Sequence, residues 1–161
     1  MLSRIAATLC ALALLIGWAG TGPGRAARGA TGPKTAPTAP ARMKAVVRDW
    51  SRLLNAGDNE GVARLFSLPA VVVQGPYAYR LRTYDQLALW HAALPCSGTI
   101  VSISIRGRYA TAIFRLGNRR RSRCDAPGGL AAARFEIVRG KIRSWEQVAV
   151  PAEGRDDQPI A

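Results

Sequence analysis

Residues 45–66 read AVVRDWSRLLNAGDNEGVARLF, and this stretch decides the fold. Its apolar side chains recur at the spacing of a helix, so one side must be covered by a curved apolar surface. Gly57 suits a left-handed helix end, and Asp58 is a residue type that caps the start of a following helix. We therefore expect a long amphipathic helix over 42–56, a turn, and a short second helix that stops at Pro69.

The composition indicates one globular domain with a basic surface. The chain has 161 residues, 48% of them hydrophobic, with 23 Lys and Arg against 10 Asp and Glu. A net charge of +13 attracts anions of any kind, including an anionic component of the cell envelope. The basic residues are spread along the chain, however, without an aromatic-interleaved basic strand or a recognition-helix pattern. We therefore do not expect nucleic acid as a partner.

The first 41 residues have the features of an exported protein. Residues 1–19 carry Arg4, then an apolar run too short to span a bilayer comfortably, then small residues, as in a secretory signal peptide. An uncleaved membrane anchor is the alternative. Residues 20–41 are rich in Gly, Pro, Thr and Ala and predict a flexible linker. We expect one folded domain over 42–150 and a loose tail over 151–161, in a protein that is secreted or held at the cell envelope.

Two strands and a third helix are expected after the first two helices. The β-branched run at 70–74 predicts a strand, and 77–82 a second short one. Thr83 then has the position of a cap for a helix that Pro95 closes. The helical spacing places His91, the only histidine, on the apolar side of this helix.

From Thr99 onward the apolar period changes from that of a helix to two, the period of a strand. Val101, Ile103 and Ile105 alternate with polar residues, which predicts one strand of a long antiparallel hairpin. The expected strands are 99–106, 110–116, 131–138 and 141–150, with a basic loop over 118–129.

Helices followed by a meander of strands give an α+β order, with the helices on one face of a curved sheet. This order, residues 45–66 and the Gly140-Lys141-Ile142 turn followed by Trp145 resemble the nuclear transport factor 2-like superfamily. That superfamily includes ketosteroid isomerases, SnoaL-like polyketide cyclases and limonene epoxide hydrolases. The resemblance covers 42–150 and implies a cone-shaped curved antiparallel sheet covered on one face by three N-terminal helices. Because this fold hosts many unrelated functions, the resemblance does not by itself imply an activity.

The isomerase reaction needs a carboxylate base and two acidic hydrogen-bond donors, a Tyr and a protonated Asp. The positions of this chain that match the Tyr, the base and the Asp carry Trp50, Gln74 and Ala133. An indole N–H is far less acidic than a phenol, and an amide is not a useful base. We therefore do not expect isomerase activity.

The epoxide hydrolases of this fold need two carboxylates flanking an Arg. Arg134-Phe135-Glu136 resembles half of that set, and Glu146 could supply another carboxylate. If Phe135 faces the interior of the cone, strand alternation turns Arg134 and Glu136 outward together. Pairing on a solvated sheet face is therefore the favoured interpretation.

The cone implies an apolar pocket for a small molecule. Trp50 and Gln74 would give it hydrogen-bond donors, whereas His91 and Glu146 are the only candidates for an acid or base; His91 is otherwise expected at the pocket rim. No cofactor or metal is expected. The residues expected to line the pocket are Trp50, Leu54, Phe66, Val72, Gln74, Trp90, His91, Phe114, Ala133, Phe135 and Trp145.

Of the three cysteines, Cys10 lies in the N-terminal apolar run, which leaves Cys96 and Cys124. An even pair in a chain bound for an oxidising compartment suggests one disulfide; two separate buried thiols are the alternative. In a cone fold the two would meet at one end of the sheet and hold the basic loop. Two sulfurs without a histidine nearby in the sequence argue against a zinc site.

These observations predict an exported protein that binds a small, mostly apolar molecule without catalysing a reaction. One alternative is a divergent SnoaL-like isomerase or hydrolase. The other is an interaction domain of the cell envelope, which uses the outer face of the sheet for a partner or for a homodimer.

Overall fold

The structure is a computed structural model, and it describes residues 36–120 and 122–151. The predicted signal peptide, most of the predicted linker and nearly all of the predicted tail lie outside the described residues. Within the described part, no helix has both the length and the apolar character that crossing a membrane requires. The elements in chain order are α1 (Ala39–Ala56), α2 (Asn59–Arg64), β1 (Phe66–Gln74), β2 (Tyr77–Leu81), α3 (Tyr84–Ala93), β3 (Cys96–Arg106), β4 (Tyr109–Asn118), β5 (Leu130–Val138) and β6 (Lys141–Val148).

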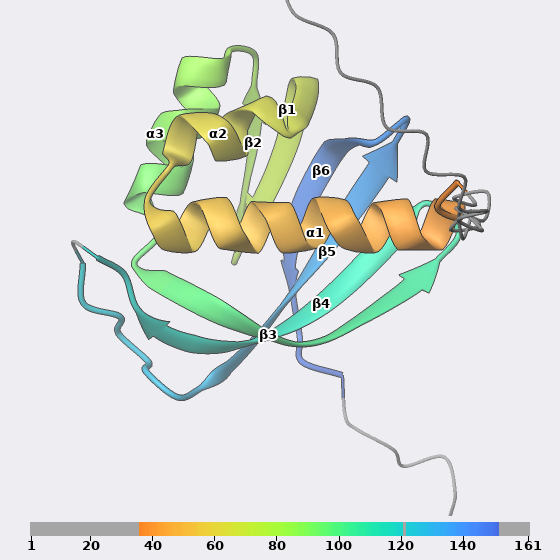
Figure 1. The fold of residues 1–161 in the computed structure, drawn as a ribbon. Coiled ribbons are helices and arrows are strands. Elements are labelled where there is room, and N and C mark those ends of the chain that lie inside the picture. The colour runs from red at the N-terminus through yellow and green to blue at the C-terminus, as the bar shows by residue number, and fades with distance from the viewer. Residues whose placement is uncertain (1–35, 121, 152–161) are drawn as a thin grey trace, which may run out of the picture. The chain divides into compact units, whose positions relative to one another are not determined.

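The six strands form one curved sheet in the order β2-β1-β6-β5-β4-β3, and the predicted α+β class is confirmed. All neighbouring strands are antiparallel except β1 and β6, which are parallel. The helix α1 lies across the concave face, as Figure 1 shows. Only α1 and α2 precede every strand, because β1 and β2 come before α3 in the chain. The sheet does not close, so β2 and β3 are its two edges.

The turn predicted after the first helix is present. Gly57 has a φ of 77° and ends α1 in the left-handed conformation, which glycine adopts without steric cost. Its N–H donates to the Leu54 carbonyl at 3.0 Å, and the Asp58 N–H donates to the Leu53 carbonyl at 3.0 Å. The Asp58 side chain accepts from the Gly61 N–H at 2.8 Å and so caps α2, as predicted.

Asn55, in the last turn of α1, joins this helix to the sheet. Its carboxamide makes two 3.0 Å hydrogen bonds with the backbone of Gly98, donating to the carbonyl and accepting from the N–H. The buried hydroxyl of Ser51, one turn earlier, donates to the same carbonyl at 3.0 Å. The C-terminal half of α1 is therefore fixed to the start of β3.

The boundaries of the first two helices differ from the prediction. Thr38 caps α1, and Pro40 in its first turn is compatible with a helix start, so α1 begins at Ala39 rather than at residue 42. The second helix ends at Arg64 and not at Pro69.

Pairing with a distant strand explains the early end of α2. Phe66 is the first residue of β1, pairs with Ile142 of β6 and is fully buried. The Leu65 carbonyl already accepts from the Ile142 N–H at 2.9 Å. Pro69 lies inside β1, where the register with β6 shifts between Phe66 and Val71. These contacts outweigh the local helical pattern, which alone extended through Phe66.

The predicted alternation of β3 is wrong at one residue. The register with β4 shifts between Ile100 and Ser102, so Val101 is an extra residue in a β-bulge. Val101 is 45% exposed, whereas Ile100 packs against the core. The inserted residue changes the face on which the preceding side chains lie, and a strict period of two cannot anticipate it.

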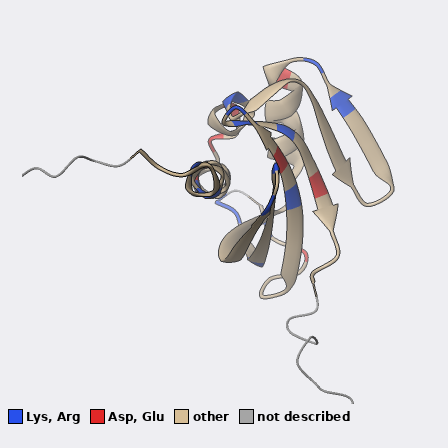
Figure 2. Cartoon of the chain, turned by 90° about the vertical axis from the view of Figure 1, so that its right-hand side faces the viewer, with Lys and Arg blue, Asp and Glu red and all other residues tan. Residues whose placement is uncertain are grey.

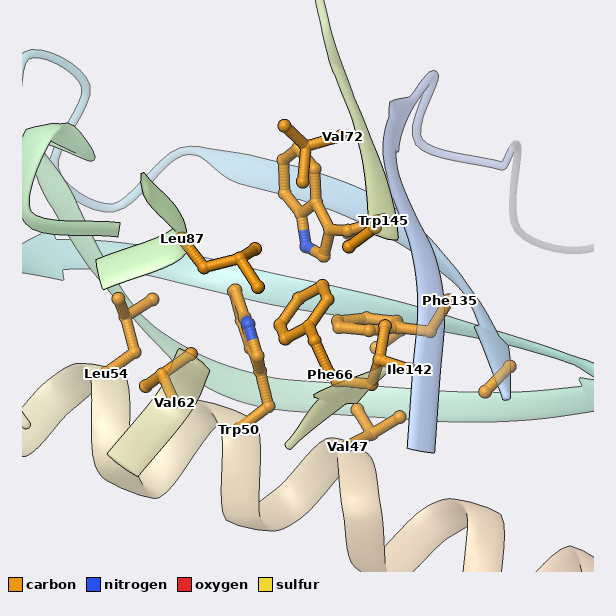
Figure 3. Packing of buried hydrophobic residues seen from close by; sticks show 14 of the residues in the cluster. Val47, Trp50, Leu54, Val62, Phe66, Val72, Leu87, Phe135, Ile142 and Trp145 are labelled. Carbon is orange, nitrogen blue, oxygen red and sulfur yellow. The ribbon is translucent and has the colours of Figure 1, made fainter. Parts of the chain in front are cut away.

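The core lies between α1 and the concave face of the sheet (Figure 3). Ala133, Phe135 and Ile137 of β5 are buried while Arg134 is exposed, which confirms the alternation predicted for this strand. The largest fully buried side chains of the described residues are Phe66, Phe135, Leu87, Ile142, His91, Val47, Val62 and Val72.

Candidate functional site

A cavity of about 170 Å³ opens between the C-terminal half of α1, the end of α3 and the concave face of the sheet. Its wall is mostly apolar, and its polar side chains are those of Gln74, Gln147, Ser97 and Asp125. The lining residues are Trp50, Leu54, Gln74, Leu94, Pro95, Cys96, Ser97, Gly98, Phe114, Leu116, Asp125, Ala131, Ala132, Ala133, Trp145 and Gln147.

The cavity exists because the residues on this part of the concave face are small, whereas larger side chains would fill the space between the sheet and α1. Ala131 and Ala133 of β5 present only methyl groups on this wall. A Cβ added at Gly98 would lie 3.0 Å from the Cβ of Phe114, so a larger residue there would displace the aromatic ring. The Phe114 ring therefore forms part of the wall instead of being pushed across the space.

Three aromatic rings form the deep part of the wall. The centroid of the Trp50 ring lies 5.7 Å from that of Phe114 and 6.3 Å from that of Trp145, with which it stacks. Figure 3 shows Trp50 rising from α1 toward Phe66 and Trp145. Trp90 of α3 packs edge-on against Trp145 at 5.0 Å from outside the cavity. The wall is rigid and apolar, as in pockets for small organic molecules.

The indole of Trp50 is held by His91. Its Nε1–H donates to His91 Nε2 at 3.1 Å. His91 Nδ1 lies 2.7 Å from the Leu87 carbonyl, which can only accept, so Nδ1 carries the proton. The pKa of His91 is lowered to about 4, mainly by burial and to a smaller extent by the nearby Arg119 charge, while the hydrogen bond to Leu87 opposes the shift. His91 is therefore a neutral imidazole with both ring nitrogens occupied.

This pair changes two expectations about hydrogen bonding and catalysis. The Trp50 N–H points to His91, so it is not a free donor for a molecule in the cavity. His91 is fully buried and does not line the cavity, instead of lying at its rim. Its lone pair is occupied by Trp50, so it has no free site with which to accept a proton from a substrate.

A donor that the sequence analysis missed lies on Trp145. Among the described residues, Trp145 Nε1 is a buried polar atom without a hydrogen-bond partner. Trp145 itself lines the cavity. Buried indole N–H groups usually find an acceptor, and a sequence cannot show that one is missing.

The opening of the cavity is lined by polar side chains, and the predicted disulfide lies beside it. Gln74 of β1 and Gln147 of β6 lie on adjacent strands at this opening. Cys96 and Cys124 form a disulfide, which confirms their predicted pairing. Cys96 lines the opening, and so does Asp125, the residue that follows Cys124. The two sulfurs and a carboxylate oxygen of Asp125 lie within 4.8 Å of one another. Because the sulfurs are bonded to each other, they offer no thiolate to a metal ion.

The basic loop is partly turned inward. The guanidinium of Arg119 donates to the carbonyls of His91 at 2.7 Å and Leu94 at 2.8 Å, and to the Asn59 side chain at 2.8 Å. A longer contact of 3.5 Å reaches the Leu54 carbonyl near the end of α1. Arg119 therefore caps helix ends behind the cavity, and partial burial lowers its pKa from the usual value.

The carboxylate candidates of the epoxide-hydrolase arrangement lie outside the cone. Glu146 pairs with Arg134 at 2.5 Å, and Glu136 pairs with Arg108 at 3.1 Å. Tyr109 lies between these pairs, with both Arg108 and Arg134 over its ring. This network is on the outer sheet face, as strand alternation predicted, and Glu146 does not line the cavity.

Six of the eleven residues predicted to line a pocket do line this cavity: Trp50, Leu54, Gln74, Phe114, Ala133 and Trp145. The other five, Phe66, Val72, Trp90, His91 and Phe135, do not. Phe66, Val72, His91 and Phe135 are fully buried in the core, because their elements pack directly against one another there. Ser97, Asp125 and Gln147 were missed, since nothing in a strand pattern shows which end of the strand opens to solvent.

The sequence matches no protein-family model, and no curated protein is similar to it. Solved structures, however, share the fold. A protein of Sinorhizobium meliloti provisionally named a polyketide cyclase is 15% identical, with a TM-score of 0.56 over 66% of this chain and 98% of its own. An NTF2-like protein of unknown function from Cytophaga hutchinsonii is 10% identical, with a TM-score of 0.55 over 71% of this chain and 92% of its own. A protein of Kribbella flavida provisionally named a ketosteroid isomerase is 16% identical, with a TM-score of 0.53 over 74% and 89%.

Proposed function

We propose that this protein is exported and binds a small, mostly apolar molecule in the cavity of the nuclear transport factor 2-like fold, without catalysing a reaction on it. The main support for this proposal is the cavity, whose deep wall consists of aromatic and small apolar residues and whose opening is lined by polar residues. A dry apolar cavity of about 150 Å³ can hold benzene. One ring or a short branched chain therefore fits inside, and the rest of the ligand extends through the opening.

The polar groups suggest how such a ligand is oriented. The Trp145 ring lines the cavity, and its buried N–H lacks an acceptor, which costs free energy, so a shift of the ring on binding would bring this N–H to an oxygen atom of the ligand. The amides of Gln74 and Gln147 both donate and accept, so they suit a polar group at the opening. Export is supported by the disulfide, which persists in oxidising compartments.

The absence of catalysis is proposed from the groups around the cavity. Asp125 is the one titratable side chain among the described residues that line it, and it is exposed on the loop at the opening. The position that resembles the isomerase base carries Gln74, which cannot take a proton. His91 and Glu146 are occupied by Trp50 and Arg134.

The proposal is tested by native mass spectrometry of the purified protein, with identification of any molecule that co-purifies. The identified molecule, or 2-naphthol as a probe, is then titrated while the indole N–H signals are followed by NMR. We expect the Trp145 signal to shift and saturate. Q147W places a large ring at the opening and should weaken ligand binding about tenfold or more, because the ring occupies space through which the ligand enters and extends.

R143W is the matched control, since Arg143 lies on the same strand, is exposed and does not line the cavity. Equal binding by the Q147W and R143W variants would contradict the proposed site. Conversion of the identified molecule to a product by the unmodified protein would contradict the non-catalytic part of the proposal.

A further inference from the structure

The strand β3 ends the sheet, and the backbone along one of its sides is free of a neighbouring strand. Leu116 of β4 bonds through its N–H and carbonyl to Gly129 and Gly128, on the side away from β3. Its partner Gly98 therefore directs its own N–H and carbonyl away from β4, toward the free edge. There the carboxamide of Asn55 makes the two bonds that a neighbouring strand would make.

Beyond Gly98 no such side chain fills the edge in the described structure. After the bulge the alternation shifts by one residue, so Ile103 and Ile105 direct their backbone groups to the edge. A groove follows this edge beside α1, in two hollows that share Lys44 and Ile103. It reaches from Asn55 near the end of α1 to Pro40 near its start, so it is long enough for an extended peptide.

The wall of the groove on α1 is basic. Lys44, Arg48 and Arg52 are spaced four residues apart, which places them on one side of the helix, and all three line the groove. Figure 2 shows α1 end-on, with basic residues on the helix. Arg52 has an exposed partner in Asp49 at 3.3 Å, and no Asp or Glu is among the residues that line the groove. The groove is therefore electrostatically suited to an acidic occupant.

We propose that this groove binds an acidic, extended segment of a partner protein, which adds a strand beside β3. The backbone N–H and carbonyl groups of Ile103 and Ile105 supply the main-chain bonds of strand addition. Glutamate or aspartate side chains of the segment face Lys44, Arg48 and Arg52, which favours an acidic sequence over others. The groove follows the edge of the sheet, and Gly98 is the one residue that lines both the groove and the cavity.

The probe for this proposal is a fluorescent peptide of alternating valine and glutamate, measured against the full chain by fluorescence anisotropy and by NMR of the backbone amides. We expect saturable binding that shifts the amide signals of Ile103 and Ile105. The same peptide with N-methyl groups on alternate residues keeps its charge but loses main-chain donors, so it should not bind at the same concentrations. Equal binding by the N-methylated peptide would overturn strand addition, because charge attraction alone would then explain the result.

Charge-reversal variants test the position of the site. K44E/R48E should weaken binding of the valine-glutamate peptide about tenfold, since two attractive charges become repulsive. R80E/R82E makes the same change in charge beside β2, the opposite edge, and should leave binding unchanged. Equal loss in both variants, or binding of phosphatidylglycerol vesicles in place of the peptide, would overturn the proposal.

Discussion

The imidazole of His91 is held on both sides by groups of fixed polarity. The Leu87 carbonyl requires a hydrogen on Nδ1, and the Trp50 N–H requires a lone pair on Nε2. Protonation would place a second hydrogen on Nε2 opposite the indole hydrogen, in a buried site close to the positive charge of Arg119. The folded state therefore excludes the charged form that the unfolded chain adopts freely.

This predicts a loss of stability in mild acid. The pKa of His91 falls from 6.5 in the unfolded chain to about 4 in the folded one, so the folded state binds fewer protons between these values. Above pH 6.5, His91 should not change the free energy of unfolding with pH. Below pH 6.5, the free energy of unfolding should fall by about 1.4 kcal/mol per pH unit and then level off near pH 4. The total loss is about 3 kcal/mol.

Urea unfolding of the protein and of H91Q between pH 7.5 and pH 4 measures this effect. Both proteins share the carboxylates that also titrate, so the difference between their curves isolates the histidine. We expect the H91Q curve to be flatter by the amount stated. Parallel curves would show that His91 is not held in its neutral form.

At the scale of elements, one guanidinium connects two helices to the loop before β5. Arg119 donates to the His91 and Leu94 carbonyls at the end of α3 and to Asn59 at the start of α2. The last carbonyls of a helix have no partner within it, and a positive charge there is favourable. The arginine-rich loop therefore contributes to holding α2 and α3 together.

The variant R119M should destabilise the protein by about 2–3 kcal/mol, because hydrogen bonds from a charged donor are worth about 1.5–3 kcal/mol each and methionine supplies none. Arg120 is exposed and adjacent, so R120M is the matched control and should change stability by less than about 0.5 kcal/mol. Thermal or urea unfolding compares the two. If R119M and R120M both changed stability by less than about 0.5 kcal/mol, the guanidinium of Arg119 would be solvated and would not stabilise the packing of α2 and α3.

The elements were predictable where one local pattern dominates. The turn at Gly57, the Asp58 cap, the Thr83 cap of α3 and the inward face of β5 follow from residue type and spacing alone. The early end of α2 and the bulge at Val101 were not predictable, because pairing with a strand far along the chain decides both. For the same reason the lining of the cavity was predicted only in part, since it depends on where strands end and which side chains already have partners.

At the scale of the whole domain, the disulfide closes the end of the cone that carries the cavity. Cys96 begins β3 after α3, and Cys124 lies in the loop between β4 and β5. The link joins residues 28 apart in the chain and holds Asp125 at the opening. Cavity shape and stability should therefore depend on the same bond.

The variant C96A/C124A should be less stable by about 3–4 kcal/mol, the chain-entropy value for a loop of this length. It should also bind the cavity ligand more weakly, because the loop that carries Asp125 is no longer fixed at the opening. Unfolding in urea and the NMR titration described for the unmodified protein measure the two effects. S104A/T111A, at a paired position of β3 and β4 away from the opening, is the control and should leave ligand binding unchanged. Loss of stability with unchanged ligand affinity would show that the disulfide supports the fold without shaping the site.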